Sequence, residues 1–254
     1  MSEYIADRND DDSSEDSGSY EEWIPSFCAR FGHEYYCQIP SEFLEDDFNM
    51  TALALEVPLY RQALDLILDL EAVSDDEAEH GENGQPEVSR SLVEHAAEQL
   101  YGLAHARYVL TRPGLQALAE KFDRRAFGTC PRYHCGGMQL LPCGLSDTLG
   151  RQPVRLYCAC CGDLYVPAQA RHAQLDGCFW GTSLPGVFLQ HFPELGEYVG
   201  KRPVQSYSLR VFGFGVNERA VSGARMAWLR QRPSTEEEWE EYAKCEYEMP
   251  TEVS

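Results

Sequence analysis

Four cysteines in two closely spaced pairs constrain this chain more than any other feature. Cys130 and Cys135 form a C-x4-C pair, and Cys158 and Cys161 form a C-x2-C pair further along. Each spacing suits a tight knuckle, and two knuckles can supply four thiolates to one tetrahedral Zn²⁺. All positions around the metal are then filled, which leaves none for a catalytic water. The pattern therefore predicts a zinc ribbon with one structural Zn²⁺ per chain.

Disulfide bonds and thiol catalysis are the other roles open to the ten cysteines. The chain opens with a charged stretch and not an apolar leader, which indicates a reducing compartment where disulfides are rare. A catalytic cysteine needs a paired histidine, which the sequence does not exclude. Five cysteines stand singly, as small buried hydrophobic residues often do: Cys28, Cys37, Cys143, Cys178 and Cys245.

The identity of the ligands is less constrained than the presence of the site. Cys160 lies between Cys158 and Cys161, and His134 adjoins Cys135, so either could substitute for its neighbour. The spacing favours the four paired cysteines as the ligand set.

The net charge of −21 is concentrated in three segments. Residues 1–22, 74–87 and 233–254 together hold 23 of the 42 acidic residues and 2 of the 21 basic ones, and the remainder is neutral. These segments are also rich in Ser, Gly and Pro, which is typical of disordered or loop sequence. Their charge would attract basic partners and disfavours direct binding to DNA. No apolar run approaches the roughly 18 residues of a membrane span.

The first half of the chain has the periodicity of helices. Between positions 58 and 70, apolar residues follow the stripe of a core-facing helix: Leu59, Ala63, Leu66, Ile67 and Leu70. Further helices are expected over residues 20–30, 40–48, 89–110 and 113–122. His95 and His105 lie on the 89–110 helix without a second metal ligand at i+4, so we interpret both as ordinary helical histidines.

From residue 127 the pattern changes to Gly, Pro, Cys and short β runs, over 156–167, 177–192 and 208–216. Such runs predict antiparallel strands around the metal. Gly136, Gly137 and Gly162 follow cysteines, where tight turns require positive φ. The sequence therefore predicts an α+β protein, with an all-helical amino-terminal domain, a zinc-ribbon antiparallel β domain, and acidic disordered termini.

Eight collinear runs resemble the regulatory β subunit of casein kinase II, and they extend over most of the chain. They are RQALDLILDLE (61–71), AAEQLYGLAHARYVLT (96–111), FGTCPRYHC (127–135), LPCGLSD (141–147), LYCACCGDLY (156–165), DGCFWGTSLP (176–185), KRP (201–203) and RVFGF (210–214). A set of motifs in this order is far more specific than a ribbon alone.

The resemblance implies an assembly. The four paired cysteines match the family's zinc ligands, and the family's ribbon is a homodimer interface that holds two catalytic subunits in a tetramer. The segment after the ribbon would contact the kinase, and the family's aromatic anchors fall on Phe212 and Phe214. The implied domains are an acidic disordered segment (1–19), a helical domain (20–125) with an acidic loop (74–87), a dimerising zinc ribbon (126–200), a kinase-docking segment (201–232) and an acidic tail (233–254).

Phe212 and Phe214 can also be judged physically. Gly213 interrupts the run, so both rings can protrude on one side of a bent hairpin. Alternation also permits a core strand, and only the resemblance favours an exposed binding site. The family usually has a tyrosine at the position of Phe212, whose ring lacks that hydroxyl.

Two further sites rest on the resemblance. The acidic loop matches the family's acidic groove, which takes polyamines and basic substrate segments: Asp75, Asp76, Glu77 and Glu79. Ser13 has an acid three residues downstream, which suits phosphorylation by the family's own kinase. The acidic tail departs from the basic or mixed tails of the family, and its role is open.

The chain carries no P-loop, kinase or G-x-S-x-G motif, which indicates a regulatory protein and not an enzyme. It would assemble and stabilise catalytic subunits and modulate their choice of substrate, in cytoplasm and nucleus and away from membranes. The alternative is a zinc-ribbon protein of the transcription machinery that binds nucleic acid, since the region past the ribbon is locally basic. A catalytic zinc is disfavoured, because four thiolates close the site.

Overall fold

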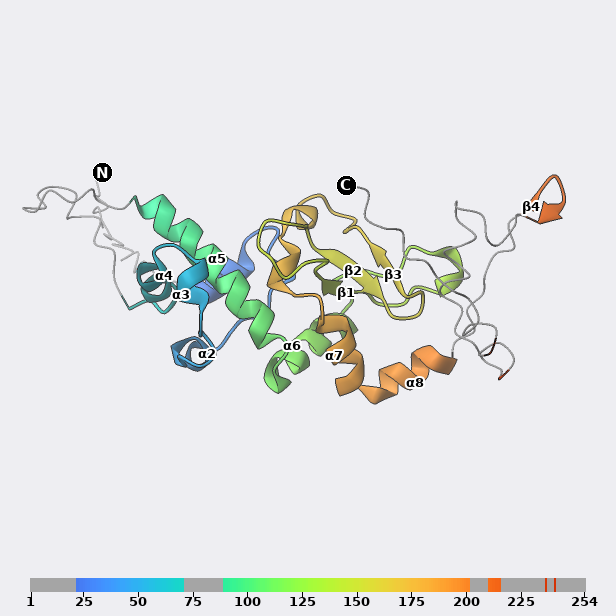
Figure 1. Ribbon diagram of the computed structural model, residues 1–254, viewed down its shortest axis with the longest axis horizontal. Coiled ribbons are helices and arrows are strands. Elements are labelled where there is room, and N and C mark those ends of the chain that lie inside the picture. The colour runs from blue at the N-terminus through green and yellow to red at the C-terminus, as the bar shows by residue number, and fades with distance from the viewer. Residues whose placement is uncertain (1–21, 71–88, 202–209, 216–235, 237–239, 241–254) are drawn as a thin grey trace, which may run out of the picture. The chain divides into compact units, whose positions relative to one another are not determined.

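Helices precede a small antiparallel sheet along the chain in the computed structural model (Figure 1), which confirms the α+β fold class. The structure describes residues 22–70, 89–201, 210–215, 236 and 240. The chain divides into two compact units, Met1–Tyr108 and Val109–Ser254. Among the described helices, none combines the length and hydropathy that a membrane crossing requires.

The first unit consists of helices. They are α1 (Trp23–Ala29), α2 (Ser41–Glu45), α3 (Leu53–Glu56), α4 (Tyr60–Ile67) and α5 (Arg90–Tyr108). The four that the periodicity predicts are present, and α3 is an additional short helix that follows Ala52 in a left-handed conformation. On α4, Ala63 and Ile67 of the predicted stripe are fully buried, whereas Leu70 lies beyond the helix and is exposed.

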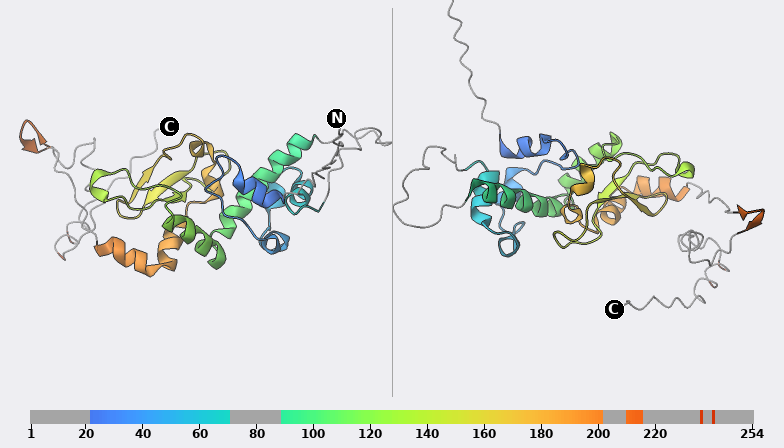
Figure 2. Two further views of the ribbon diagram at one scale, coloured as in Figure 1. Left: turned by 180° about the vertical axis from the view of Figure 1, so that it is seen from behind. Right: turned by 90° about the horizontal axis from the view of Figure 1, so that it is seen from above.

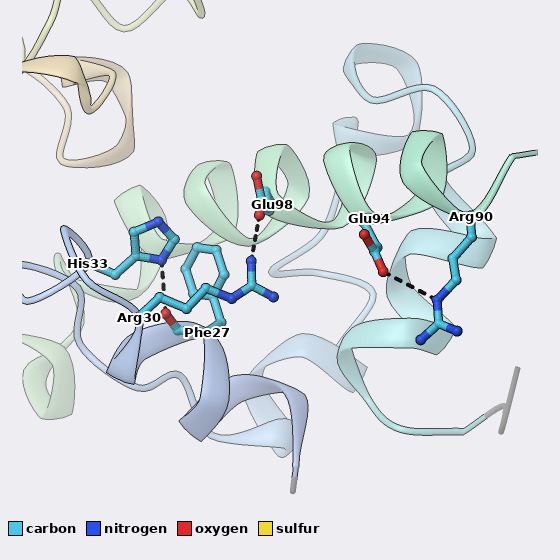
Figure 3. Close-up of polar contacts among 6 residues, drawn as sticks. All are labelled: Phe27, Arg30, His33, Arg90, Glu94 and Glu98. Carbon is cyan, nitrogen blue, oxygen red and sulfur yellow. Dashed lines mark hydrogen bonds and ion pairs between the residues drawn. The ribbon is translucent and has the colours of Figure 1, made fainter. Parts of the chain in front are cut away.

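Helix α5 is the centre of this unit and runs alongside α4 (Figure 1, Figure 2). Its second half is buried on nearly every side, because small residues such as Ala97 and Ala104 let neighbouring segments approach it closely. Its exposed first half carries ion pairs, Arg90 with Glu94 at 3.3 Å and Arg30 of the α1 end with Glu98 at 2.7 Å (Figure 3).

Two polar side chains of α5 bind the extended backbone that connects α1 to α2. The Tyr101 hydroxyl donates to the Cys37 carbonyl oxygen at 2.9 Å and accepts from the Ile39 N–H at 3.1 Å. Nε2 of His105 accepts from the Cys37 N–H at 3.0 Å. Both side chains are fully buried, so His105 has a structural role, in agreement with its interpretation from sequence.

Removal of the Tyr101 hydroxyl tests this connection. Tyr101→Phe keeps the ring in place but leaves the Cys37 carbonyl and the Ile39 N–H without their partner. We expect the free energy of unfolding of the helical unit to fall by about 1–3 kcal/mol, measured by urea denaturation followed by circular dichroism. The control Tyr198→Phe, at a half-exposed tyrosine of the second unit, should change the measured free energy of unfolding by no more than about 0.5 kcal/mol. Equal stability of the two variants would contradict the proposed role.

The second unit begins with α6 (Arg112–Asp123), whose first turn is capped by the Thr111 side chain. A three-stranded antiparallel sheet follows in the order β1 (Leu141–Cys143), β2 (Arg155–Cys158) and β3 (Asp163–Tyr165). Three short 3-10 helices, η1 (Tyr133–Cys135), η2 (His172–Gln174) and η3 (Gly177–Phe179), lie in its connections. Helices α7 (Leu184–His191) and α8 (Pro193–Lys201) and a hairpin of β4 (Arg210–Val211) and β5 (Phe214–Gly215) come last.

The β run expected over 177–192 is wrong, because this segment forms η3 and α7. Its buried residues Leu184, Pro185 and Phe188 are spaced to share one face of a helix and do not alternate as in a strand. Pro185 lies in the first turn, where its missing N–H costs no helical hydrogen bond.

Helix α6 packs within the second unit. It lies beside α7 (Figure 1, Figure 2), and the rings of Phe122 and Phe188 have centroids 5.5 Å apart. The observed division after Tyr108 therefore differs from the expected one after residue 125, which grouped α6 with the preceding helices.

Two aspartates fasten the loops that follow β1. The Asp147 carboxylate accepts hydrogen bonds from the Thr182 N–H at 2.7 Å and from its hydroxyl at 3.0 Å. The Asp176 carboxylate accepts from the Cys178 N–H at 3.0 Å and from the Gly150 N–H. Segments about thirty residues apart are thereby held together around the sheet.

A glycine pair allows the same loops to touch. A Cβ atom at Gly144 would lie 2.5 Å from the carbonyl oxygen of Gly177, closer than real Cβ atoms approach an oxygen. Glycine is therefore required at position 144, where one backbone passes directly over another.

Candidate metal centre

The four paired cysteines come together at the end of the sheet. Cys130 precedes η1 and Cys135 ends it, while Cys158 ends β2 and Cys161 lies in the turn before β3. Their Sγ atoms all lie within 4.8 Å of one another. Two knuckles that are remote in sequence thus present one cluster of four sulfurs.

The separations of the sulfurs fit a metal and not disulfides. Sγ of Cys130 lies 3.7 Å from that of Cys161, and Sγ of Cys135 lies 3.5 Å from that of Cys158. A disulfide requires about 2.05 Å. Four sulfurs at about 2.3 Å from a tetrahedral centre would lie about 3.8 Å apart. The cluster therefore has the size of a four-coordinate thiolate site.

Glycines shape both knuckles as expected. The three glycines that follow the second cysteine of each knuckle adopt positive φ: Gly136 at 67°, Gly137 at 71° and Gly162 at 65°. In the second knuckle, the Gly162 N–H donates to the Cys158 carbonyl oxygen at 2.9 Å. This hydrogen bond closes the turn that places the Cys161 sulfur beside that of Cys158.

Burial and local hydrogen bonds shift the pKa values of the thiols in the cluster. Cys130, Cys135 and Cys158 are buried, and Cys161 is partly exposed. Burial raises the pKa of Cys158, and it raises the pKa of Cys161 to about 11. Burial acts in the same direction on Cys130, but the Tyr165 hydroxyl and the Arg132 backbone lower its pKa on balance. Metal binding would displace protons from the two thiols with raised pKa values.

The other cysteines do not join the cluster. Among the described residues, the grouped ligand atoms belong to the four paired cysteines, and the half-buried Cys160 is not one of them. The side chain of His134 and all of Cys245 lie outside the described residues. Burial raises the pKa of Cys143 to about 12, which leaves little of the thiolate that a nucleophile needs.

An ion pair beside the sulfurs was not anticipated from the sequence. Nη1 of Arg132, within the first knuckle, lies 3.2 Å from Oδ2 of Asp163, directly after the second knuckle. Each residue lies two positions after a cysteine of a different pair, Arg132 after Cys130 and Asp163 after Cys161, but their pairing depends on the fold.

Large apolar side chains are exposed around the knuckles. Tyr133 of η1 is 91% exposed, and Leu164 of β3 and Val166 after it are also exposed. Exposed apolar groups next to a rigid cluster are typical of a surface for protein contacts.

The hairpin presents both aromatic residues singled out in the sequence. Phe212 is 98% and Phe214 is 79% exposed, so neither belongs to a core strand. Phe212 and Gly213 form the two-residue turn, with φ of 51° and 86°. Positive φ at both positions is the geometry of a type I′ turn, and it is uncommon for a bulky residue.

The remaining predicted sites lie outside the described residues. These are Ser13 and the acidic loop with Asp75, Asp76, Glu77 and Glu79. The acidic segment 1–19 and, apart from residues 236 and 240, the tail 233–254 lie outside them as well.

Comparisons with known proteins agree with the motifs around the cluster. The family model described as casein kinase II regulatory subunit matches residues 22–215. Casein kinase II subunit beta of Saccharomyces cerevisiae is 61% identical over 273 aligned positions, which cover 98% of each chain. Casein kinase II subunit beta' of Drosophila melanogaster is 40% identical over 204 positions, 80% of this chain and 87% of the relative.

The family model covers the described helices of the first unit, the sulfur cluster and the hairpin in one match. The chain belongs to the family of casein kinase II regulatory (beta) subunits.

Proposed function

We propose that this chain is a non-catalytic regulatory subunit that forms a zinc-dependent homodimer and assembles two casein kinase II catalytic subunits into a tetramer. Membership of the family, over residues 22–215, is the observation that carries this proposal. In the assembly the chain stabilises the active conformation of the kinase by binding it preferentially, and it modulates the choice of substrate.

The metal is Zn²⁺, at one per chain. An all-sulfur set of four ligands suits a soft or borderline metal, and zinc favours the tetrahedral geometry that the spacing of the cluster supports. With four protein ligands the site has no open position, so the zinc contributes folding energy and not chemistry.

The ribbon provides the dimer interface. Its exposed apolar residues, Tyr133, Leu164 and Val166, flank the knuckles whose shape the metal fixes. Burial of such side chains against a second copy would contribute most of the association energy. In this proposal, zinc binding and dimerisation are therefore coupled.

The hairpin contacts the catalytic subunit. Phe212 and Phe214 offer two exposed rings on a tight turn, which is the character of residues that dominate binding energy when they enter partner pockets. The loss of the family's hydroxyl at Phe212 leaves an apolar contact as its contribution.

The acidic segments recruit basic partners in this proposal. The loop over 74–87 carries six acids and neither Lys nor Arg, so it would attract basic substrate segments or polyamines. Ser13 is the proposed site of phosphorylation by the kinase, and cytoplasm and nucleus are the proposed locations. Direct contact with nucleic acid is not part of the function, since the net charge opposes it.

Loss of one ligand should abolish both zinc binding and dimerisation. Cys130→Ser and Cys161→Ser each remove a thiolate, and folding of the ribbon and metal binding share one free energy. Native mass spectrometry should show one zinc per chain and a dimer for the wild type, and a metal-free monomer for either variant. Cys160→Ser, next to a ligand but outside the cluster, should retain both. A zinc-free dimer would contradict the coupling.

Truncation of the two rings should weaken kinase binding and spare the dimer. For Phe212→Ala combined with Phe214→Ala, we expect a loss of about 2 kcal/mol or more, which is at least thirtyfold in Kd for the catalytic subunit. Calorimetric titration with the purified catalytic subunit measures this change in Kd. Phe48→Ala, at an equally exposed ring in the helical unit, is the matched control and should bind normally. Unchanged affinity of the double variant would refute the docking role.

A further inference from the structure

The residues of the unanticipated ion pair are each fixed to a different knuckle. The Arg132 carbonyl oxygen accepts a hydrogen bond from the Cys135 N–H at 3.0 Å, so its backbone is part of the first turn. Asp163 lies opposite Cys158 in the β2–β3 ladder, so its backbone is part of the second. The 3.2 Å contact between their side chains therefore crosses from one pair of ligands to the other.

The environment of this pair differs from that of the surface ion pairs. The side chain of Asp163 is 16% exposed and that of Arg132 is 32%, compared with 41% and 45% for Glu98 and Arg30 (Figure 3). Exposed pairs contribute little to stability because water and salt screen them. A pair that is largely removed from water interacts more strongly, and its loss leaves a poorly solvated charge.

The charges of the cluster also favour an arginine here. Four thiolates around a zinc dication carry an excess of negative charge, which a nearby guanidinium offsets.

We propose that Arg132 and Asp163 form a clasp across the two cysteine knuckles that holds the four sulfurs in their binding arrangement and slows the release of the metal. Arg132 and Asp163 are positioning residues in this role and do not bind the metal themselves. The proposal rests on the zinc site of the proposed function and adds a determinant of its lifetime.

The physical basis is preorganisation. Metal loss requires the knuckles to separate, and separation breaks the ion pair as well as the metal–sulfur bonds. Residues that orient ligands from outside the coordination sphere typically change metal affinity by about 10–100-fold when they are removed. Cys161, two residues before Asp163, is the one partly exposed ligand of the four, so its side of the cluster should open first.

The test measures zinc transfer from the full-length dimer to an excess of a chromophoric chelator. For Asp163→Asn and for Arg132→Met, we expect release about tenfold faster than for the wild type. The double variant should release zinc no faster than either single one, because both changes remove the same interaction. Arg30→Met breaks the ion pair of the helical unit in Figure 3 and should leave the rate unchanged.

Cobalt substitution separates a clasp from general damage. If the pair acts as proposed, Co²⁺-loaded Asp163→Asn should keep the intense sulfur-to-cobalt charge-transfer bands of a tetrahedral site while releasing its metal faster. Loss of the bands would mean that the variant no longer forms the site, and would overturn a positioning role. Asp163→Asn is isosteric, so it decides the test even if Arg132→Met fails to fold.

Release rates within twofold of the wild type for both single variants would overturn the clasp. That result is distinguishable from failure of the proposed function, which would appear as wild-type protein that lacks zinc or does not bind the catalytic subunit. A wild type with one zinc per chain and normal kinase binding, together with unchanged variant rates, contradicts the clasp alone.

Discussion

Closure of two cysteine knuckles onto one another is the constraint on which the second unit depends. Its sheet has strands of only three, four and three residues, too few for a stable sheet on their own. Four sulfurs within 4.8 Å of one another bring the end of β2 and the turn before β3 to the segment of η1, and Cys135 and Cys158 in this cluster are 23 residues apart in sequence. The loops fastened by Asp147 and Asp176 and the packing of α6 against α7 supply further contacts within this unit.

The helical unit is held together by hydrogen bonds from buried side chains of its central helix and not by a cluster of sulfurs. Its long central helix has no strong amphipathic stripe, because its second half is buried nearly all round. Tyr101 and His105 of this helix bind the extended backbone segment between α1 and α2 by hydrogen bonds. One unit is thus organised by sulfur ligands and the other by two buried polar side chains.

Local signals in the sequence predicted the sulfur cluster, its turns and most of the helices of the first unit. Cysteine spacing identified the cluster, the glycines after cysteines marked its turns, and the stripe through Ala63 and Ile67 placed α4. The segment 177–192 was misread because its Gly and aromatic content resembles strand sequence, although its buried positions follow a helix. Long-range pairs such as Phe122 with Phe188, or Arg132 with Asp163, leave no trace in periodicity, since their geometry exists only after folding.

The positive φ of Phe212 gives its proposed docking role a cost in hairpin stability. A non-glycine residue in the left-handed region costs about 1–2 kcal/mol, and the free chain bears this cost whether or not a partner is present. Glycine at this position would relax the turn but would remove the ring. If Phe212 docks on the catalytic subunit as proposed, selection for a more stable hairpin and selection for an exposed aromatic ring act in opposite directions on this one residue.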